Sequence, residues 1–571
     1  MNLRRKFSVG RQVPSGLLIM NLACLSLVAA QNNQATQGGD KQLSAPMQMN
    51  SPATGRARLI RGLGNVHHPV TTTSPEAQRF FDQGLMLHYG FNEEEAVRSF
   101  RRAAELDPNM AMAYWGIALA AGPSYISYIR PGAPVQEKIP FESILKAMSL
   151  RAKFPEHERA YIEALSQRYT DAPNPDYQQL NLAYRDAMRE LSKRYPDDLD
   201  AATLYAESLM IAGHPWALWN ADGTPAEGTP EILAVLETAL RRDPDHIGAI
   251  HYYIHAVEAS PHPERALAEA NRLASLAPSA GHLVHMPSHI YMEIGDYDAA
   301  ARANLEAAGA DENSFVHSYV HDLEVLVAAS DMEGRYAQAI EAANRLHAFV
   351  DSRLHEFPVM EHLLPTPLIV MLRFERWDDI LKVQQPDVNM MTSNWMWHYA
   401  RGMALAAKGR VEEAEHEHGI LAAIEASTPE DAVFRRPFTD TTKSMIELAG
   451  TVLDAKIATA KQDNPSAIRL FEKAVTLQDH LGWSEPPDWY YPVRESLGAL
   501  LLKTGHYERA EQIFREDLER NPRNGRSLFG LAEALAAQGK NYEAELVRQQ
   551  FHTAWKNADT PLENVATANH R

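Results

Sequence analysis

One pattern of small and aromatic residues recurs along the chain at a fixed spacing. Near the end of the sequence, Leu497-Gly498 is followed 34 residues later by Leu531-Ala532. Much earlier, Gly84 precedes Phe100 by the same 16 residues that separate Gly498 from Phe514. Small residues at fixed positions let the two helices of a hairpin approach closely, and a proline after the second helix ends it. The pattern therefore predicts a stack of helical hairpins.

This unit resembles the tetratricopeptide repeat, a 34-residue helix-turn-helix, and the resemblance covers most of residues 73–558. Each hairpin leaves an apolar face that the next hairpin covers, so the resemblance implies an all-α fold, a right-handed α-solenoid. The histidine-rich stretches 251–255 and 285–291 resemble a family of exported bacterial tetratricopeptide-repeat proteins that has no settled activity. The clearer copies span about 77–109, 229–278, 279–311, 490–523 and 524–557, and insertions interrupt 122–140 and 213–230.

The first thirty residues have the pattern of an export signal. Arg4, Arg5 and Lys6 form a basic start, and an apolar run from Gly16 ends in small residues at Ala30. The match to a twin-arginine signal is partial. We therefore expect a periplasmic or secreted protein with a signal peptide at 1–30 and a flexible linker at 31–57. Residues 58–350 then form repeats that carry the histidines, 351–558 form further repeats, and 559–571 form a flexible tail.

Charge and cysteine content exclude several functions. The 571 residues include 74 Asp and Glu against 55 Lys and Arg, a net charge of -19, which disfavours nucleic acid as a partner. The single cysteine, Cys24, leaves with the signal peptide, so no disulfide or cysteine-ligated metal is expected. No second apolar stretch is long enough to span a membrane. Any chemistry must rest on histidine, carboxylate, tyrosine or backbone groups.

Histidines supply the strongest functional signal. His251 and His255 form an H-x3-H pair, and His285 and His289 form a second pair one 34-residue period later. Side chains four residues apart share one face of a helix, a spacing that lets two imidazoles bind one metal ion. Residues one repeat apart lie on neighbouring helices. In tetratricopeptide repeats these positions line the concave groove, so the resemblance implies that four imidazoles meet there.

Further candidates surround these pairs. His282 belongs to the same face as the second pair, and His317 and His321 form a third pair that fits the repeat less well. With a third histidine on each side, the pairs would give a two-metal centre such as a six-histidine copper pair. Nitrogen ligands without sulfur suit a divalent transition metal, Zn, Cu or Fe. Glu258 and Glu207 are the candidate catalytic carboxylates, as general base or as groups that orient the ligands.

Three functions remain open from the sequence. The first is a metal-binding groove, with or without an enzymatic reaction, for which the paired histidines are the evidence. The second is a scaffold that holds a protein or peptide in the groove without catalysis, which is the usual use of such repeats. The third is a receptor for a small molecule or glycan that uses Trp216, Trp219 and Tyr252. The oligomeric state does not follow from the sequence.

Overall fold

The structure is a computed structural model of the chain. It describes residues 56–125, 138–172, 175–213, 217–220, 222–311, 316–434, 440–489 and 491–562. The expected signal peptide at 1–30, nearly all of the linker at 31–57 and most of the tail at 559–571 lie outside these residues, as does Trp216.

Secondary structure in the described residues is helical, apart from two isolated β-bridges that pair Trp219 with Pro225 and Val433 with Thr441. The helices of the first half are α1 (Pro75–Tyr89), α2 (Glu93–Leu106), α3 (Ala111–Ala121), α4 (Lys138–Leu150), α5 (Glu156–Ser166), α6 (Tyr177–Arg194), α7 (Leu199–Ala212), α8 (Thr229–Arg242), α9 (Ile247–Val257), α10 (Leu267–Leu276), α11 (Gly281–His285) and α12 (Pro287–Glu293).

Those of the second half are α13 (Tyr297–Asp311), α14 (Val316–Met332), α15 (Tyr336–Asp351), α16 (Thr366–Arg373), α17 (Trp377–Ile380), α18 (Met391–Ala407), α19 (Val411–Ser427), α20 (Thr442–Ala460), α21 (Asn464–Asp479), α22 (Val493–Lys503), α23 (Tyr507–Arg520), α24 (Gly525–Ala537) and α25 (Asn541–Ala554). Short 3-10 turns occupy Arg151–Lys153, Pro263–Ala266 and Pro358–Leu363.

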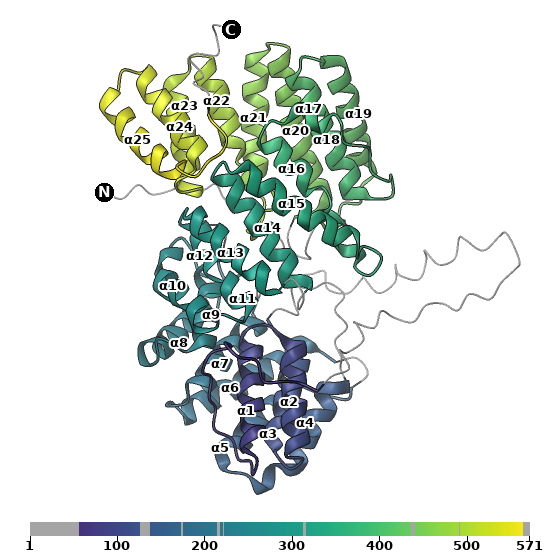
Figure 1. Ribbon diagram of the computed structural model, residues 1–571, viewed down its shortest axis with the longest axis vertical. Helices are drawn as coiled ribbons and strands as arrows, with labels where there is room; N and C mark the ends of the chain where they lie inside the picture. Colours follow the sequence, from purple (N-terminus) through teal and green to yellow (C-terminus); the bar gives the residue numbers. More distant parts are fainter. Residues whose placement is uncertain are drawn as a thin grey trace, which may run out of the picture. The chain divides into compact units, whose positions relative to one another are not determined.

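Helices that follow one another in the sequence pack against one another, as Figure 1 shows for the α1–α2 and α24–α25 hairpins. The buried apolar residues form three clusters along the chain, from Ala57 to Ile290, from Tyr297 to Phe374 and from Leu368 to Val547. Each hairpin thus covers an apolar face of its neighbour, as expected for stacked repeats. The fold is an all-α solenoid of helical repeats, which confirms the predicted fold class.

Helix starts follow local capping rules. Ser74 accepts a hydrogen bond from the Ala77 amide of α1, and Asp198 accepts one from the Ala201 amide of α7. Such side chains satisfy amide groups that have no partner within the helix. None of the helices in the described part of the chain combines the length and the apolar character needed to cross a bilayer.

The repeated glycine and phenylalanine positions explain how closely the helices pack. A Cβ atom at Gly84 in α1 or at Gly116 in α3 would overlap the ring of Phe100 in α2. At the other end of the chain, a Cβ at Gly498 or Gly530 would overlap the ring of Phe514 in the same way. In these two repeats, one aromatic ring on the second helix therefore fits against glycines of the two flanking first helices.

Replacing Gly116 with alanine is expected to lower the free energy of unfolding by about 1–3 kcal/mol, because the added methyl group overpacks the core against Phe100. Gly419, exposed on α19, has no heavy atom within 4 Å of a built Cβ and serves as the control. Gly419→Ala should raise the free energy of unfolding by up to about 1 kcal/mol, from helix propensity alone. Urea unfolding followed by circular dichroism measures both, and equal effects would contradict the packing.

Candidate metal centre

Two neighbouring first helices bring the paired histidines together. His251 and His255 both lie in α9, as predicted. His285 ends α11 and His289 lies in α12, because Pro287 lacks an amide hydrogen and the helix is interrupted at Met286. The sequence predicted one continuous helix here. The interruption still leaves the rings of His285 and His289 only 4.8 Å apart between centroids.

Three imidazoles form a first group, His251, His255 and His282, with one possible ligand atom from each within 4.8 Å of the others. The Nε2 atoms of His251 and His282 are 3.1 Å apart. His251 donates its Nδ1 hydrogen to the backbone carbonyl of Tyr89, at 2.5 Å. That hydrogen bond leaves Nε2 of His251 without a proton and directed at its neighbours, as in metal-binding histidines.

A second group consists of His285, His289, His321 and Glu485, whose possible ligand atoms also lie within 4.8 Å of one another. The Nε2 atoms of His285 and His289 are 2.8 Å apart. His321 Nε2 lies 2.9 Å from Glu485 Oε2, and His289 Nε2 lies 3.5 Å from the same oxygen. Three imidazoles and one carboxylate therefore face one point.

The amide of Asn304 fixes the tautomer of His285. Its nitrogen donates to the Ala300 carbonyl at 2.8 Å, so its oxygen is the atom that faces His285 Nδ1, at 2.6 Å. An amide oxygen can only accept a hydrogen bond, so Nδ1 of His285 carries the proton. Nε2 of His285 is consequently a lone pair, and it points at His289.

Glu258 joins the two groups. It follows α9 directly, and its Oε1 lies 3.1 Å from His255 Nδ1 while its Oε2 lies 2.5 Å from His289 Nδ1. Because a carboxylate only accepts hydrogen bonds, Glu258 places the proton of His255 on Nδ1 and leaves its Nε2 for the first group. The contact of Glu258 Oε2 with His289 Nδ1 is an ion-pair contact.

Aromatic side chains enclose the first group. Phe91 stacks on the rings of His255 and His282, with centroids 5.6 and 5.2 Å away. Its φ is +55°, a left-handed conformation that costs a residue with a Cβ about 1–2 kcal/mol. Tyr125 packs on His255 from 5.3 Å. The centre is thus closed by packed rings, whereas the resemblance implied a groove lining.

Burial sets the charge state of the centre. His251 and His285 have no exposed surface, and His255 and His289 are each 5% exposed. Burial, followed by the neighbouring histidines, holds the pKa of His251, His282 and His285 well below the ordinary value. Burial opposes ionisation of Glu485, but His289 and His321 outweigh it and hold the pKa of this carboxyl well below its usual range. Neutral imidazoles beside a carboxylate are the protonation states that metal binding requires.

These distances are close to those of a coordination sphere. Zn–N bonds of about 2.0–2.1 Å place two ligand nitrogens of a tetrahedron roughly 3.3–3.4 Å apart. The observed Nε2 pairs, at 3.1 and 2.8 Å, would need to separate by only about half an ångström. The arrangement can therefore accept an ion in each group with small side-chain movements.

Comparison with known proteins agrees with the repeat packing. The tetratricopeptide-repeat family profile matches residues 496–548, which include the Phe514 contact with its two glycines. Residues 496–548 therefore match a tetratricopeptide repeat. No curated protein matches it.

Solved structures similar to this chain have low TM-scores. The human IFIT1 dimer with m7Gppp-AAAA gives a TM-score of 0.31 and 12% identity over 85% of this chain and 91% of that one. The TPR domain of P58(IPK) gives 0.24 and 11% over 81% and 98%, and yeast Tom70 gives 0.26 and 13% over 84% and 90%. TM-scores this low support no conclusion about function.

Most of the ligands predicted from the sequence meet in the two groups. These are His251, His255, His282, His285, His289 and His321. The side chain of His317, at the start of α14, lies outside the described side chains. Glu485, Asn304 and the Tyr89 carbonyl were not anticipated, because nothing near them in the sequence resembles a ligand motif. Tyr252 is fully buried, and the indole of Trp219 donates to the Ala256 carbonyl.

Of the two candidate catalytic carboxylates, only Glu258 lies between the ligand groups. Glu207 is buried in α7, with its Oε2 3.5 Å from His88 Nε2. His88 Nδ1 lies 3.0 Å from Glu93 Oε2, so this histidine sits between two carboxylates. Burial lowers the pKa of His88, but Glu93 and Glu207 outweigh it and raise the pKa from 6.5 to about 10.

The raised pKa of His88 predicts a pH-dependent stability. A proton bound more tightly in the folded chain stabilises it fully below about pH 6.5, and this contribution is lost as the pH rises through about 10. His88→Gln should lower the free energy of unfolding at pH 6 by about 1–3 kcal/mol, because a buried acceptor loses its partner. The deficit should shrink towards pH 10 in urea unfolding. A deficit of equal size at pH 6 and pH 10 would contradict the assignment, and exposed His262→Gln is the control.

Proposed function

We propose that this protein binds transition-metal ions in a largely buried six-histidine centre, one ion in each histidine group. His251, His255 and His282 supply the first group, and His285, His289 and His321 supply the second, with Glu485 as its carboxylate. Glu258 is a positioning residue between the groups. With the export pattern of residues 1–30, the proposal places this centre outside the cytoplasm.

The contact between His285 and His289 carries the proposal. The proton of His285 lies on Nδ1, which faces Asn304 Oδ1, so its Nε2 is a lone pair. His289 Nδ1 lies 2.5 Å from Glu258 Oε2, and its Nε2 lies 2.8 Å from His285 Nε2 and 3.5 Å from Glu485 Oε2. Two imidazole nitrogens and a carboxylate oxygen thus face one point, which a metal ion bound by both nitrogens would fill.

A purely structural role for these histidines fits less well. Buried polar atoms in a folded protein normally have hydrogen-bond partners. His255 Nε2 is buried and has none among the described residues, while its Nδ1 faces Glu258. The ring is held in place by one nitrogen, and the other faces the first group. Histidines kept only for packing would have both nitrogens satisfied.

The ligand atoms limit the metals that this centre can bind to one class. Imidazole nitrogen suits Zn, Cu and Fe, and no cysteine remains to select softer ions. The first group offers three imidazoles, whereas the second adds the carboxylate of Glu485. The two ions would therefore bind in different electrostatic environments. The second group, which includes a carboxylate, should prefer the ion of higher positive charge.

Metal analysis of the full chain tests the proposal. The chain is loaded separately with Zn²⁺, Cu²⁺ or Fe²⁺, dialysed against a weak chelator, and analysed by inductively coupled plasma mass spectrometry. We expect one tightly held ion for each histidine group with at least one of the metals. Metal content no greater than that of a chain without such clusters would contradict the proposal and favour the protein-binding scaffold.

A further inference from the structure

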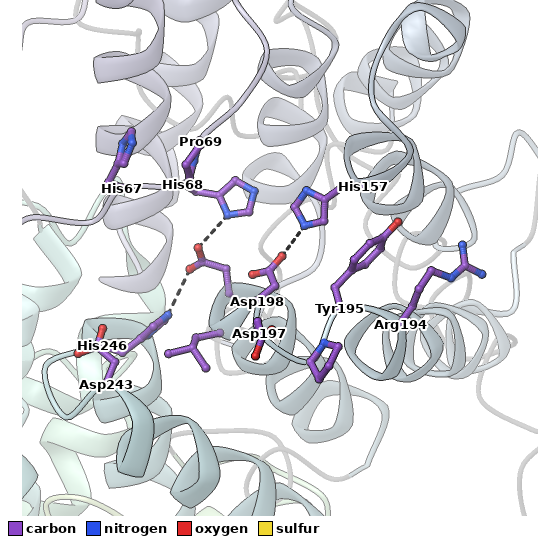
Figure 2. A pocket seen from close by; sticks show the side chains of 13 residues that line it. His67, His68, Pro69, His157, Arg194, Tyr195, Asp197, Asp198, Asp243 and His246 are labelled. Carbon is purple, nitrogen blue, oxygen red and sulfur yellow. Dashed lines mark hydrogen bonds and ion pairs between the residues drawn. The ribbon is translucent and has the colours of Figure 1, made fainter.

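A second cluster of possible ligands lines an open pocket beside the first helices (Figure 2). The pocket has a volume of about 680 Å³. His68 comes from the segment before α1, His157 from α5, and Asp198 from the start of α7. Histidine and aspartate from three separate parts of the chain therefore meet at one wall.

The distances in this cluster are short. One possible ligand atom from each of His68, His157 and Asp198 lies within 4.8 Å of the other two. His157 Nε2 donates a hydrogen bond to Asp198 Oδ2 at 2.7 Å, and a bound ion would take the place of that proton. The His68 and His157 rings stack with centroids 5.8 Å apart and planes 23° apart. The three side chains share one small region of the wall.

Carboxylate and phenol groups hold the cluster from behind. Asp200 Oδ2 lies 2.8 Å from His68 Nδ1, which places the proton of that ring on Nδ1 and leaves Nε2 as a lone pair. The other oxygen of Asp200 accepts the Tyr89 hydroxyl at 2.6 Å. Tyr161 donates its hydroxyl to Asp198 at 2.7 Å. Carboxylates that orient histidines in this way are characteristic of metal sites.

We infer that His68, His157 and Asp198 form a second, solvent-open binding site for a divalent transition-metal ion such as Zn²⁺. Three protein ligands leave a fourth position of a tetrahedral ion directed at the pocket, where water or a small ligand can bind. The side chains of His157 and Asp198 are 33% and 12% exposed. This inference does not depend on the proposed function.

One residue connects this site with the six-histidine centre. The Tyr89 hydroxyl donates to Asp200, which orients His68, and the Tyr89 carbonyl accepts the Nδ1 hydrogen of His251. The supporting groups of the two sites thus share a single residue at the end of α1. The ions themselves would bind to different ligands, so each site can be removed separately.

Zinc titration of the full chain tests the inference. Isothermal titration calorimetry with Zn²⁺ compares the wild-type chain with His157→Gln and with Asp198→Asn, which keeps a side chain able to cap α7. We expect each variant to lose one zinc equivalent or to bind it at least about 10-fold more weakly. His67→Ala is the matched control, since His67 lines the same pocket, is 61% exposed and lies outside the cluster.

The outcomes separate this site from the six-histidine centre. If His157→Gln and Asp198→Asn, both folded by circular dichroism, bind zinc with wild-type stoichiometry and affinity, the inference is wrong. The same titration is repeated in the His255→Ala/His289→Ala background, where the pocket equivalent should persist and again disappear with His157→Gln. Equal loss in His67→Ala would show adventitious surface binding and would also overturn the inference.

Discussion

Replacing His255 and His289 with alanine is expected to weaken transition-metal binding by more than about 100-fold. Each substitution removes one ligand from a different histidine group. Even residues that only orient ligands contribute about 10–100-fold to metal affinity, so the loss of a ligand in each group should cost more. Competition with a chromogenic chelator, on the full chain, measures the affinity.

A control variant with two exposed histidines separates this effect from general histidine binding. His262 and His416 are exposed and belong to neither group. His262→Ala/His416→Ala should retain wild-type affinity. A similar loss in both double variants, or no loss in either, would contradict the assignment of the ligands. Circular dichroism confirms that both variants remain helical.

Replacing Glu258 with glutamine is expected to weaken binding by about 10–100-fold while the shape of the side chain is kept. The carboxylate accepts from Nδ1 of His255 and lies against Nδ1 of His289, but an amide offers one oxygen and one NH₂ group. The ring that faces the NH₂ group must accept at Nδ1, so its proton moves to Nε2. That nitrogen can no longer bind an ion.

The effect of Glu258→Gln should therefore fall mainly on one of the two groups. Titration of the variant should show one weakened equivalent and one close to the wild type. Glu264→Gln, at an exposed glutamate in the 3-10 turn Pro263–Ala266, is the control and should change neither. Two unchanged equivalents in Glu258→Gln would show that this carboxylate does not position the ligands.

The sequence predicts the fold because each repeat carries its own packing signal. Gly84 and Phe100 in the first unit and Gly498 and Phe514 near the end make the same contact, and the spacing alone reveals it. The offset of 34 residues also predicts that His251 and His285 occupy neighbouring helices. Local packing positions and the 34-residue period are therefore enough to predict the fold and the neighbouring helices of His251 and His285.

Other features of the site depend on contacts between distant parts of the chain, which the repeat period does not predict. Glu485 comes from the segment between α21 and α22, far along the chain from the histidines that it faces. Pro287 interrupts a helix that the repeat pattern predicts as continuous. The pocket at His68 and His157 joins a segment before the first repeat to α5. Such contacts follow from how the repeats stack, which the sequence of a single repeat does not determine.

Whether the two histidine groups bind metal ions can be seen by anomalous diffraction, collected at the zinc edge, from crystals of the full chain loaded with Zn²⁺. We expect one anomalous peak about 2.0–2.1 Å from Nε2 of both His285 and His289, and a second peak among His251, His255 and His282. The absence of a peak from both groups, with the His285 and His289 rings still in direct contact, would contradict it.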